Sequence, residues 1–447
     1  MSLDRAAVLD RFQRARARTR ALFEILEDGA YDLRPIASWN HVAFYEGHLP
    51  AFAVTALLGK GLGEPGIDAD LDARFASGIS PDEDTPTAED GRPTWPGRAI
   101  VRQYADEAER RICDAIAHAD FGREDRLLAR QALWTILDYE EAHHESLACL
   151  WHQLPYVVKR KPVHYVTAPP RLRTGAAPLT RVRVPAGRAT LGTRLRQGLG
   201  GQVLTPLHPS ATYHLRPTIP CAWDNELPAH TVDVGAFEVD VHNVTNARFM
   251  DFVESGGYAD PRWWSDADRA WMLAERVSHP AFWIFEDGSW HWRGMFEQVP
   301  LPEHWPVYLT WAEAHAYARW RGQRLFTEAE FHRSAYGTPR PGEEREYPWG
   351  DELPRRLPSN LDFTRWDPDP VDAHPSGVSA FGVHDLVGNG WEWTGDLSAP
   401  LEGCAPMALM KGASPATSRG LVRRGFRHWC PPRFPHVYAT FRCVGPA

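Results

Sequence analysis

The stretch GNGWEWT at residues 388–394, together with GQRLFTEAE at residues 322–330, decides how this chain is expected to fold. In both stretches, glycine stands close to apolar or aromatic residues. Glycine allows positive φ angles and close approach of the backbone, and a buried tryptophan anchors a core while its indole N–H finds an acceptor. The two stretches therefore predict tight turns that are fixed to an aromatic core.

Comparable short stretches recur on both sides of these two. Around them, short β-like pieces at residues 180–184 and 231–239 and a helix at residues 311–321 are separated by Gly, Pro and Trp. This pattern predicts a mixed, irregular α+β domain over residues 179–447. The other stretches are VPAG at 184–187, LG at 191–192, WDNELP at 223–228, VTN at 244–246, GGY at 256–258, WPV at 305–307, YPWG at 347–350, KGAS at 411–414 and FRC at 441–443.

The residues before this domain carry apolar side chains at helical spacing. Four such segments fit a four-helix bundle over residues 1–155. The stretch 59–96, rich in Gly, Pro and Asp, is expected to be a long crossover, and residues 156–178 are expected to form a linker. The four segments lie at residues 8–26, 39–58, 100–116 and 127–150.

Composition excludes several classes of partner. A formal net charge of −9 would not attract nucleic acid or an anionic membrane surface. No apolar run reaches the roughly 18 residues of a membrane helix, the N-terminus lacks a hydrophobic signal core, and the six cysteines form no Cys-x-x-Cys pair. We therefore expect a cytoplasmic protein. The basic run at residues 11–20 is interpreted as a solvated helix face.

In this order, the stretches of the α+β domain resemble the formylglycine-generating-enzyme (sulfatase-modifying factor) family, whose fold is a variant of the C-type lectin architecture. The resemblance implies a candidate calcium site at Asp385, Glu392 and the carbonyls of Gly388 and Gly390, an oxygen-rich set that suits this ion. Formylglycine generation itself is not expected, because the family's catalytic cysteine pair has no counterpart in KGASPAT at residues 411–417.

Fusion of this domain to a helical bundle resembles the hercynine-oxygenase-like synthases of the ergothioneine and selenoneine pathways, in which the bundle is DinB-like. The resemblance implies Fe(II) as cofactor. It implies O₂, a histidine betaine and a sulfur or selenium donor as reactants, and a new C–S or C–Se bond on the imidazole. In that family three histidines hold the iron, one from a Gly-His pair on an early helix and two from a His-x-x-x-His-x-Glu motif on the last helix.

The late motif departs from the family at one position. His48 aligns with the ligand of the early Gly-His pair, with His41 as the alternative. His143 and Glu145 align with the second histidine and the glutamate of the late motif. Tyr139 stands where the family has its first histidine. The expected metal-binding residues are therefore His48, Tyr139 and His143, with Glu145 supporting them from outside the ligand set.

Three interpretations of this departure remain open. A tyrosinate at Tyr139 ligates iron, as tyrosine does in some haem enzymes. Alternatively, the ligand set has shifted to Glu140 and His144, which are also one helical turn apart, and His48 completes it. In the third interpretation the site is degenerate and binds no catalytic metal.

A late segment, residues 425–434, resembles a stretch that lines the family's substrate pocket, so His428, Trp429, Cys430 and Phe434 are the expected substrate contacts. Relatives that use γ-glutamylcysteine have an Asp directly after the Trp and an Arg four residues later, where this chain has Cys430 and Phe434. Losing both charges removes the charge-assisted contacts that a zwitterionic peptide needs. A neutral donor such as a thio- or selenosugar is expected, which places the chain nearer to selenoneine synthase. Trp429 and His428 would face the trimethylammonium group, which a tryptophan face attracts.

Two other functions remain open from the sequence. The tyrosine in the metal motif also fits a retired enzyme that acts as a binding protein, and an iron oxygenase acting on another substrate fits the same architecture. No catalytic acid is assigned, because residues 393–411 contain no tyrosine that aligns with one.

Overall fold

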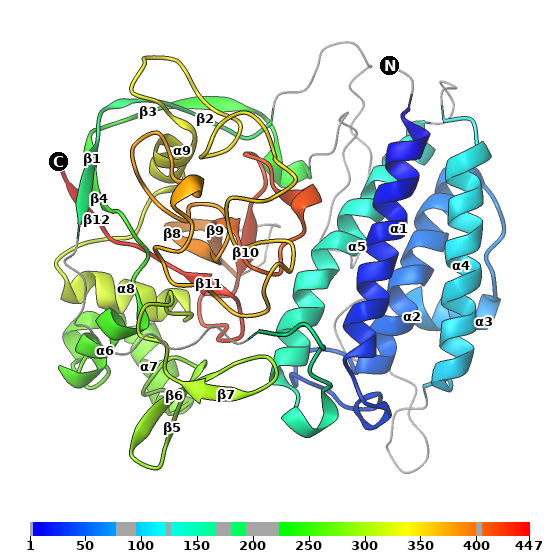
Figure 1. The fold of residues 1–447 in the computed structure, drawn as a ribbon, viewed down its shortest axis with the longest axis horizontal. Coiled ribbons are helices and arrows are strands. Elements are labelled where there is room, and N and C mark those ends of the chain that lie inside the picture. Colours follow the sequence, from blue (N-terminus) through cyan, green and yellow to red (C-terminus); the bar gives the residue numbers. More distant parts are fainter. Residues whose placement is uncertain (1–2, 77–94, 122–126, 167–179, 194–222, 399–404) are drawn as a thin grey trace. The chain divides into compact units, whose positions relative to one another are not determined.

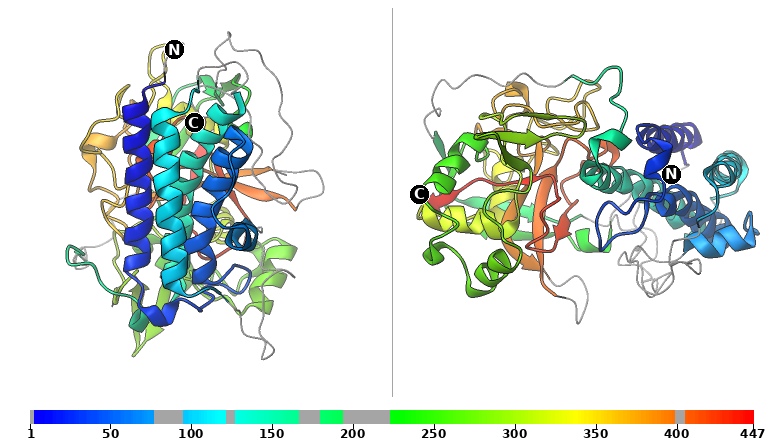
Figure 2. Two further views of the ribbon diagram at one scale, coloured as in Figure 1. Left: turned by 90° about the vertical axis from the view of Figure 1, so that its right-hand side faces the viewer. Right: turned by 90° about the horizontal axis from the view of Figure 1, so that it is seen from below.

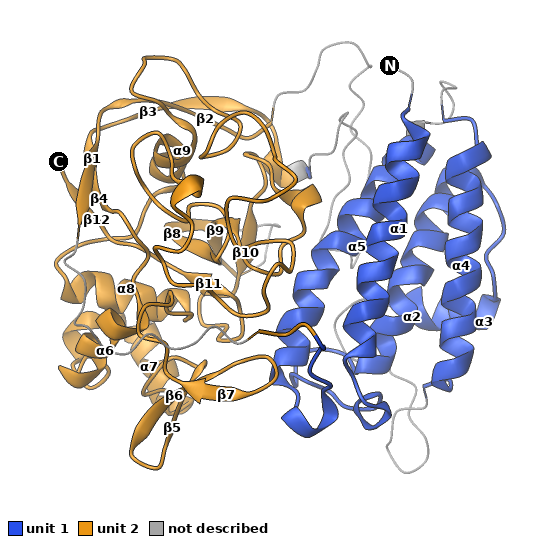
Figure 3. Ribbon diagram, in the orientation of Figure 1, with its two compact units in different colours: residues 1–163, 195–224 blue, residues 164–194, 225–447 orange. Residues whose placement is uncertain are grey.

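The computed structural model describes residues 3–76, 95–121, 127–166, 180–193, 223–398 and 405–447. The chain divides into two compact units (Figure 3). The first holds residues 1–163 with 195–224, and the second holds residues 164–194 with 225–447. Within the described ranges, no helix is long and apolar enough to cross a membrane.

The first unit is helical. Its elements are α1 (Arg5–Glu24), the 3-10 turn η1 (Asp28–Ala30), α2 (Val42–Ala53), the π-helix η2 (Val54–Leu62), α3 (Ala69–Ala76), α4 (Arg98–His118), α5 (Leu127–Gln153) and the 3-10 turn η4 (Tyr156–Val158). Figures 1 and 2 show α1, α2, α4 and α5 running alongside one another, and α1 contacts both α4 and α5. Their shared core includes buried Phe12, Leu57, Ile112 and Leu137.

The second helical segment continues past its expected end, so the prediction of a crossover from residue 59 is wrong for its first part. The chain stays helical to Leu62 in η2, and α3 follows it. The glycines here serve packing. A Cβ on Gly61 would lie 3.0 Å from Cα of Ala129, so glycine lets η2 approach α5 closely. Gly63, with φ of 75°, then ends the helix in the left-handed conformation. Residues 77–94 of the expected crossover lie outside the described ranges.

The basic run on α1 is only partly solvated. Arg14 and Arg20 are exposed, as the sequence predicts, but the interpretation as a solvated helix face is wrong for Arg11 and Arg16. Arg11 donates hydrogen bonds to Glu141 at 2.7 and 2.9 Å and to Asp138 at 2.8 Å. Arg16 is only 4% exposed and donates to Glu140 at 2.7 Å. Because α5 carries acidic side chains where it faces α1, these arginines are buried as ion pairs between the two helices.

The second unit is mixed α and β, as the sequence predicts. Its helices are α6 (Asn246–Glu254), α7 (Asp266–Ala274), α8 (Trp311–Trp320) and α9 (Glu328–Tyr336), with 3-10 turns η6 (Pro261–Trp263), η7 (Pro375–Gly377) and η8 (Arg419–Leu421), while the turn η5 (Asp224–Glu226) crosses the division between units. Its strands are β1 (Arg181–Val184), β2 (Gly187–Leu191), β3 (His230–Val234), β4 (Phe237–Asp240), β5 (Trp283–Glu286), β6 (Ser289–Arg293), β7 (Gln298–Pro300), β8 (Gly390–Ser398), β9 (Met407–Ala413), β10 (His428–Cys430), β11 (Ala439–Thr440) and β12 (Val444–Pro446).

These strands form small sheets. The largest has the order β10-β9-β8-β11, in which β11 runs parallel to β8 and the other neighbours are antiparallel. A second sheet has the order β1-β4-β12, and β2-β3 and β5-β6-β7 complete the set in the described residues. The β-like piece expected at 231–239 is two strands, because β3 pairs with β2 whereas β4 pairs with β1 and β12.

The sequence analysis found only one of the four α-helices of this unit. Thr310 and Thr327 each begin a helix with a capping box, completed by Glu313 and Glu330 respectively. The expected helix at 311–321 is therefore confirmed as α8, and α9 starts inside GQRLFTEAE. Short helices such as α9 have too few residues to show a clear apolar period, so their caps are the stronger signal.

The aromatic core expected around GNGWEWT is present. Trp391 and Trp393 at the start of β8 are at most 1% exposed, and the Trp393 indole donates to the carbonyl of Leu309 at 3.0 Å. Gly388 has φ of 102°, and a Cβ there would lie 2.0 Å from Oγ of Ser359. Only glycine fits this turn, which leads the chain into its central sheet.

Candidate functional site

Three of the predicted metal-binding residues lie together in the first unit. α2 supplies His48, and α5 supplies Tyr139 and His143, which are four residues apart and so share one helix face. His48 Nε2 lies 2.8 Å from the Tyr139 hydroxyl. The ring centroids are 4.2 Å apart for Tyr139 and His143 and 6.1 Å apart for the two histidines.

Backbone carbonyls fix the tautomer of both imidazoles. His48 Nδ1 lies 2.8 Å from the carbonyl oxygen of Phe75, and His143 Nδ1 lies 2.8 Å from the carbonyl oxygen of Tyr139. A carbonyl only accepts, so each Nδ1 carries the proton and each neutral ring has its lone pair on Nε2. The Tyr139 hydroxyl therefore donates to His48 Nε2. Hydrogen bonding of the outer imidazole nitrogen to a carbonyl is typical of metal-ligating histidines.

Burial keeps both histidines neutral. It lowers the pKa of His48 to about 4, with a further contribution from the nearby His143, and it lowers the pKa of His143 to about 4. Desolvation disfavours the charged imidazolium in such a setting. At neutral pH the two rings are therefore unprotonated bases, which is the form that binds a metal.

Aromatic rings surround these residues. Phe44 stacks on His48 with centroids 4.7 Å apart, and Phe52 stacks on Tyr139 at 3.7 Å. Phe44, His48 and Phe52 are spaced by four residues, which places them on one side of the continuous helix formed by α2 and η2. Gly47 has a specific role, because a Cβ there would lie 2.4 Å from the Phe75 ring. Glycine thus admits Phe75, whose carbonyl holds His48.

The alternative pair, Glu140 and His144, lies on the neighbouring face of α5 and contacts α1. Glu140 accepts hydrogen bonds from Arg16 at 2.7 Å and from the Thr19 hydroxyl. His144 Nε2 lies 3.1 Å from the carbonyl oxygen of Ala15 and 3.0 Å from the Thr19 hydroxyl. A carbonyl acceptor requires a proton on Nε2, so this nitrogen has no lone pair for a metal. Burial lowers the pKa of His144 to about 3.

Two further candidates, His41 and Glu145, also belong to these helices. His41 is the N-cap residue of α2 and packs beside Trp95, with ring centroids 6.2 Å apart. It precedes His48 by seven residues, a rise of about 10 Å along a helix. Glu145 is buried on α5, two residues after His143, and its supporting role stays a prediction.

The donors present fit an iron ion. In the described ranges, no group of three His, Cys, Asp or Glu side chains could hold a metal. The third donor beside the two histidines is instead a phenol oxygen, and tyrosine is a known ligand of iron. Two imidazole nitrogens and a tyrosinate oxygen on facing helices would leave further positions open for small molecules.

In the second unit, the expected substrate segment, residues 425–434, contains β10. His428 and Cys430 point to one side of the strand and Trp429 to the other, because side chains alternate. The structure therefore does not place His428 and Trp429 on a common surface of this strand. His428 lies edge-on to Trp391, with centroids 5.8 Å apart, and burial lowers its pKa to about 4. Phe434 lies beyond the strand, edge-on to His436. Their roles toward a substrate stay predictions.

Cys430 is a buried neutral thiol, because burial raises its pKa. Cys443 is buried in the same way, and neither forms a disulfide. A thiol of this kind is a poor nucleophile and metal ligand.

One of the residues expected to bind calcium, Glu392, is paired with an arginine that the sequence analysis missed. Arg442 is fully buried and donates to Glu392 Oε1 at 2.5 Å. It also donates to Asn243 Oδ1 and to the carbonyls of Asp240, Val241 and His384. Asp385 accepts from Asn389 at 3.1 Å, and burial raises its pKa to about 7.

An internal guanidinium therefore already supplies positive charge to Glu392. Gly388 and Gly390 lie in the turn into β8, and calcium at this turn stays a prediction. The signal for Arg442 was present in the FRC stretch, but a single arginine in a sequence does not reveal that its side chain is buried.

The second unit of this chain is similar to proteins of known family. The model of the sulfatase-modifying factor enzyme 1-like domain matches residues 172–447, more than half of the chain. The chain belongs to the sulfatase-modifying factor enzyme 1-like family. As a member of this family, it is similar to hercynine oxygenases and to formylglycine-generating enzymes.

Three relatives show the extent of the similarity. Hercynine oxygenase of Mycolicibacterium thermoresistibile is 38% identical over 242 residues, which cover 50% of this chain and 54% of that protein. Hercynine oxygenase of Mycolicibacterium smegmatis is 34% identical over 293 residues, which cover 61% and 65%. The formylglycine-generating enzyme of Mycobacterium tuberculosis is 31% identical over 262 residues, which cover 48% and 84%. The match thus spans between half and two thirds of the length of these hercynine oxygenases.

Proposed function

We propose that this family member is an Fe(II)- and O₂-dependent oxygenase that forms a C–S or C–Se bond on the imidazole of hercynine or a related histidine betaine. The observation that carries the proposal is the convergence of His48, Tyr139 and His143. Both imidazoles present neutral Nε2 atoms, and their Nδ1–H groups are held by carbonyls. Similarity to hercynine oxygenases supports the choice of substrate.

The chain's own residues have defined tasks in this proposal. His48 and His143 would bind the iron through their Nε2 atoms, and the carbonyls of Phe75 and Tyr139 orient the two rings. Iron binding would release the Tyr139 hydroxyl proton to solvent, and the phenolate oxygen would become the third donor. Phe44 and Phe52 exclude water from the rings on which they stack. Iron held there would supply the one-electron chemistry with O₂ that these side chains lack.

The overall reaction balances with one O₂. The C–H bond of the imidazole and the S–H or Se–H bond of the donor break, and a C–S or C–Se bond forms. O₂ accepts four electrons, and one oxygen atom ends on the sulfur or selenium and the other in water. Cys430 and Phe434 supply no charge for a zwitterionic peptide, so we infer a neutral donor of the thio- or selenosugar kind.

The domain assignment belongs to the same proposal. We infer that residues 1–155 form a DinB-like four-helix bundle that carries the metal, that residues 156–178 link it to the rest, and that residues 179–447 form the C-type-lectin-like domain. The packing of α1 on α4 and α5 and of α2 on α4 supports the bundle.

Oxygen uptake tests the proposed function. Protein loaded with Fe(II) under anaerobic conditions is mixed with hercynine and a selenosugar, a thiosugar or γ-glutamylcysteine, and O₂ consumption and product mass are followed. We expect uptake that requires both iron and hercynine, and a product that joins the imidazole to the neutral donor. Iron-loaded protein that consumes no O₂ with any of these mixtures would overturn the proposal.

A second candidate function rests on one contact. The Tyr139 hydroxyl satisfies His48 Nε2 at 2.8 Å without any metal, so the same residues also suit a binding protein that has lost its chemistry. Hercynine binding by protein that retains no iron would favour this second function. One equivalent of iron together with hercynine-dependent O₂ uptake would exclude it.

A further inference from the structure

The second unit contains a cavity that none of the expected metal, calcium or substrate residues lines. Its volume is about 530 Å³, within the usual range for small-molecule sites. The walls come from residues 355–374, which precede β8, and from Arg419 at the start of η8.

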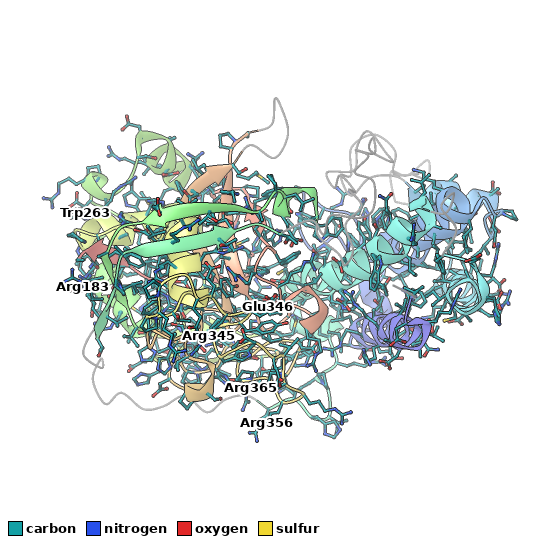
Figure 4. All side chains as sticks on the ribbon, turned by 90° about the horizontal axis from the view of Figure 1, so that it is seen from above. Arg183, Trp263, Arg345, Glu346, Arg356 and Arg365 are labelled. Carbon is teal, nitrogen blue, oxygen red and sulfur yellow. The ribbon has the colours of Figure 1, made fainter. Side chains whose placement is uncertain are left out.

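Arginines dominate this lining. Arg355, Arg356, Arg365 and Arg419 all contribute to the walls, and Arg356 and Arg365 are labelled in Figure 4. Across the described part of the chain, Arg355, Arg356 and Arg419 have no carboxylate within ion-pair distance. Arg419 is nevertheless oriented, because its Nη2 donates to the carbonyl of Pro354 at 2.9 Å.

The acidic residues of the cavity do not cancel this charge. Asp369 is buried and already has two partners, Arg365 at 2.9 Å and His374 at 3.1 Å. The contact with Asp369 raises the pKa of His374, despite the opposing effect of burial. Asp362 is the other acid in the lining, and its Oδ1 accepts from the backbone N–H of Arg419 at 3.4 Å. Four arginines and a histidine thus face two carboxylates.

We propose that this cavity binds a small molecule carrying a phosphate or diphosphate group. A cleft lined by one sign of charge raises the local concentration of ions of the opposite sign, so these arginines favour an anionic ligand even in a chain of net charge −9. Guanidinium groups recognise phosphate with paired, charge-assisted hydrogen bonds. A phosphate offers two negative charges and three terminal oxygens to several arginines, whereas a carboxylate offers one charge and two oxygens. The volume exceeds that of a lone phosphate, and Leu357 and Ala373 provide an apolar wall for the rest of the ligand.

Calorimetric titration of metal-free protein with pyrophosphate tests this site, with citrate as the carboxylate probe. We expect saturable binding of pyrophosphate at low ionic strength, at least tenfold tighter than that of citrate. The Arg355→Ala/Arg356→Ala double variant should bind roughly tenfold or more weaker, because each charge-assisted hydrogen bond contributes about this factor. Both arginines are exposed, so their loss should leave the thermal midpoint unchanged.

Arg183→Ala is the matched control. Arg183, labelled in Figure 4, is an exposed arginine of β1 in the same unit and does not line the cavity. Its variant should therefore bind pyrophosphate within twofold of wild type. Absence of saturable pyrophosphate binding, equal affinity of the double variant and wild type, an equal loss in the control, or citrate binding as tight as pyrophosphate would each overturn the proposal. Because iron is absent throughout, these outcomes are independent of the proposed oxygenase activity.

Discussion

Replacement of Tyr139 by phenylalanine removes one oxygen atom from the candidate metal centre and little else. The ring that stacks on Phe52, with centroids 3.7 Å apart, is retained. The lost hydroxyl is the group that donates to His48 Nε2 at 2.8 Å. Tyr139→Phe therefore isolates the contribution of a single donor both to folding and to metal binding.

Two magnitudes follow from this geometry. In metal-free protein, buried His48 Nε2 loses its partner, which should cost about 1–3 kcal/mol of unfolding free energy. If Tyr139 ligates iron as proposed, the iron-loaded variant has lost one of three protein ligands. Loss of an outer hydrogen-bond partner alone weakens metal affinity about 10–100-fold, so loss of Tyr139 as a ligand should weaken it by roughly 100-fold or more.

The assay combines urea denaturation of the metal-free variant with anaerobic Fe(II) titration and the absorption spectrum of the oxidised, iron-loaded protein. We expect lower stability, weaker iron binding and loss of the absorption that a tyrosinate ligand gives to ferric iron. Tyr139→His is the companion variant, since it restores a nitrogen donor and should bind iron without that absorption. Unchanged iron affinity and spectrum in Tyr139→Phe would refute ligation by Tyr139.

Three further variants or conditions have defined outcomes. Gly47→Ala should lower the unfolding free energy by about 1–3 kcal/mol and also lower the iron affinity, because the new methyl group would lie 2.4 Å from the Phe75 ring. Gly59→Ala is the control, since its methyl group would have no contact closer than 3.9 Å and should change neither quantity. Equal losses of stability for the two variants in urea denaturation would contradict this. Arg442→Met should cost about 3–5 kcal/mol because it leaves a buried carboxylate without its partner, and a loss below about 1 kcal/mol would count against the buried pair. Burial lowers the pKa of His242 to about 4, so between pH 6.5 and 4 this residue is protonated in the unfolded chain but not in the folded one. Its contribution should lower the unfolding free energy by up to about 1.4 kcal/mol for each pH unit of acidification. His242→Gln should therefore make the unfolding free energy less dependent on pH in this range.

Much of the architecture was predictable because it depends on local patterns. Apolar residues at helical spacing predicted α1, α4 and α5 to within a few residues, and tryptophans beside glycines predicted the aromatic core around β8. Helices α6, α7 and α9 were missed, because their apolar period is short and only caps such as Thr327 mark them. The sheet order of the second unit was not predictable, since β11 pairs with β8 across a long separation in sequence.

The sequence-based predictions were wrong where the structural role of a residue depends on a contact with a residue distant in sequence. Gly61 resembles a helix breaker in the sequence, yet it is the contact between η2 and α5. Arg16 resembles a solvated charge, yet it is paired with Glu140. In both cases the partner lies on another helix, so no local pattern reveals it.

The candidate site, too, was predictable from local spacing only in part, because the rest depends on contacts between helices. The sequence limited the late ligands to two pairs at a spacing of four, Tyr139 with His143 and Glu140 with His144. Only the packing distinguishes the two pairs, because the carbonyl of Ala15 on α1 accepts a hydrogen bond from the Nε2–H group of His144. The carbonyl of Phe75, which orients His48, comes from α3 and carries no side-chain signal at all.

Anaerobic Fe(II) titration of wild type and of two adjacent variants tests the central assignment most directly. His143 and His144 are neighbours in sequence and are both buried, but His143 lies beside His48 whereas His144 contacts Ala15 of α1. The wild type should bind one equivalent of iron, His144→Ala should still bind it, and His143→Ala should not. Iron binding that survives in His143→Ala and disappears in His144→Ala, or a wild-type protein that binds no iron, would contradict the account.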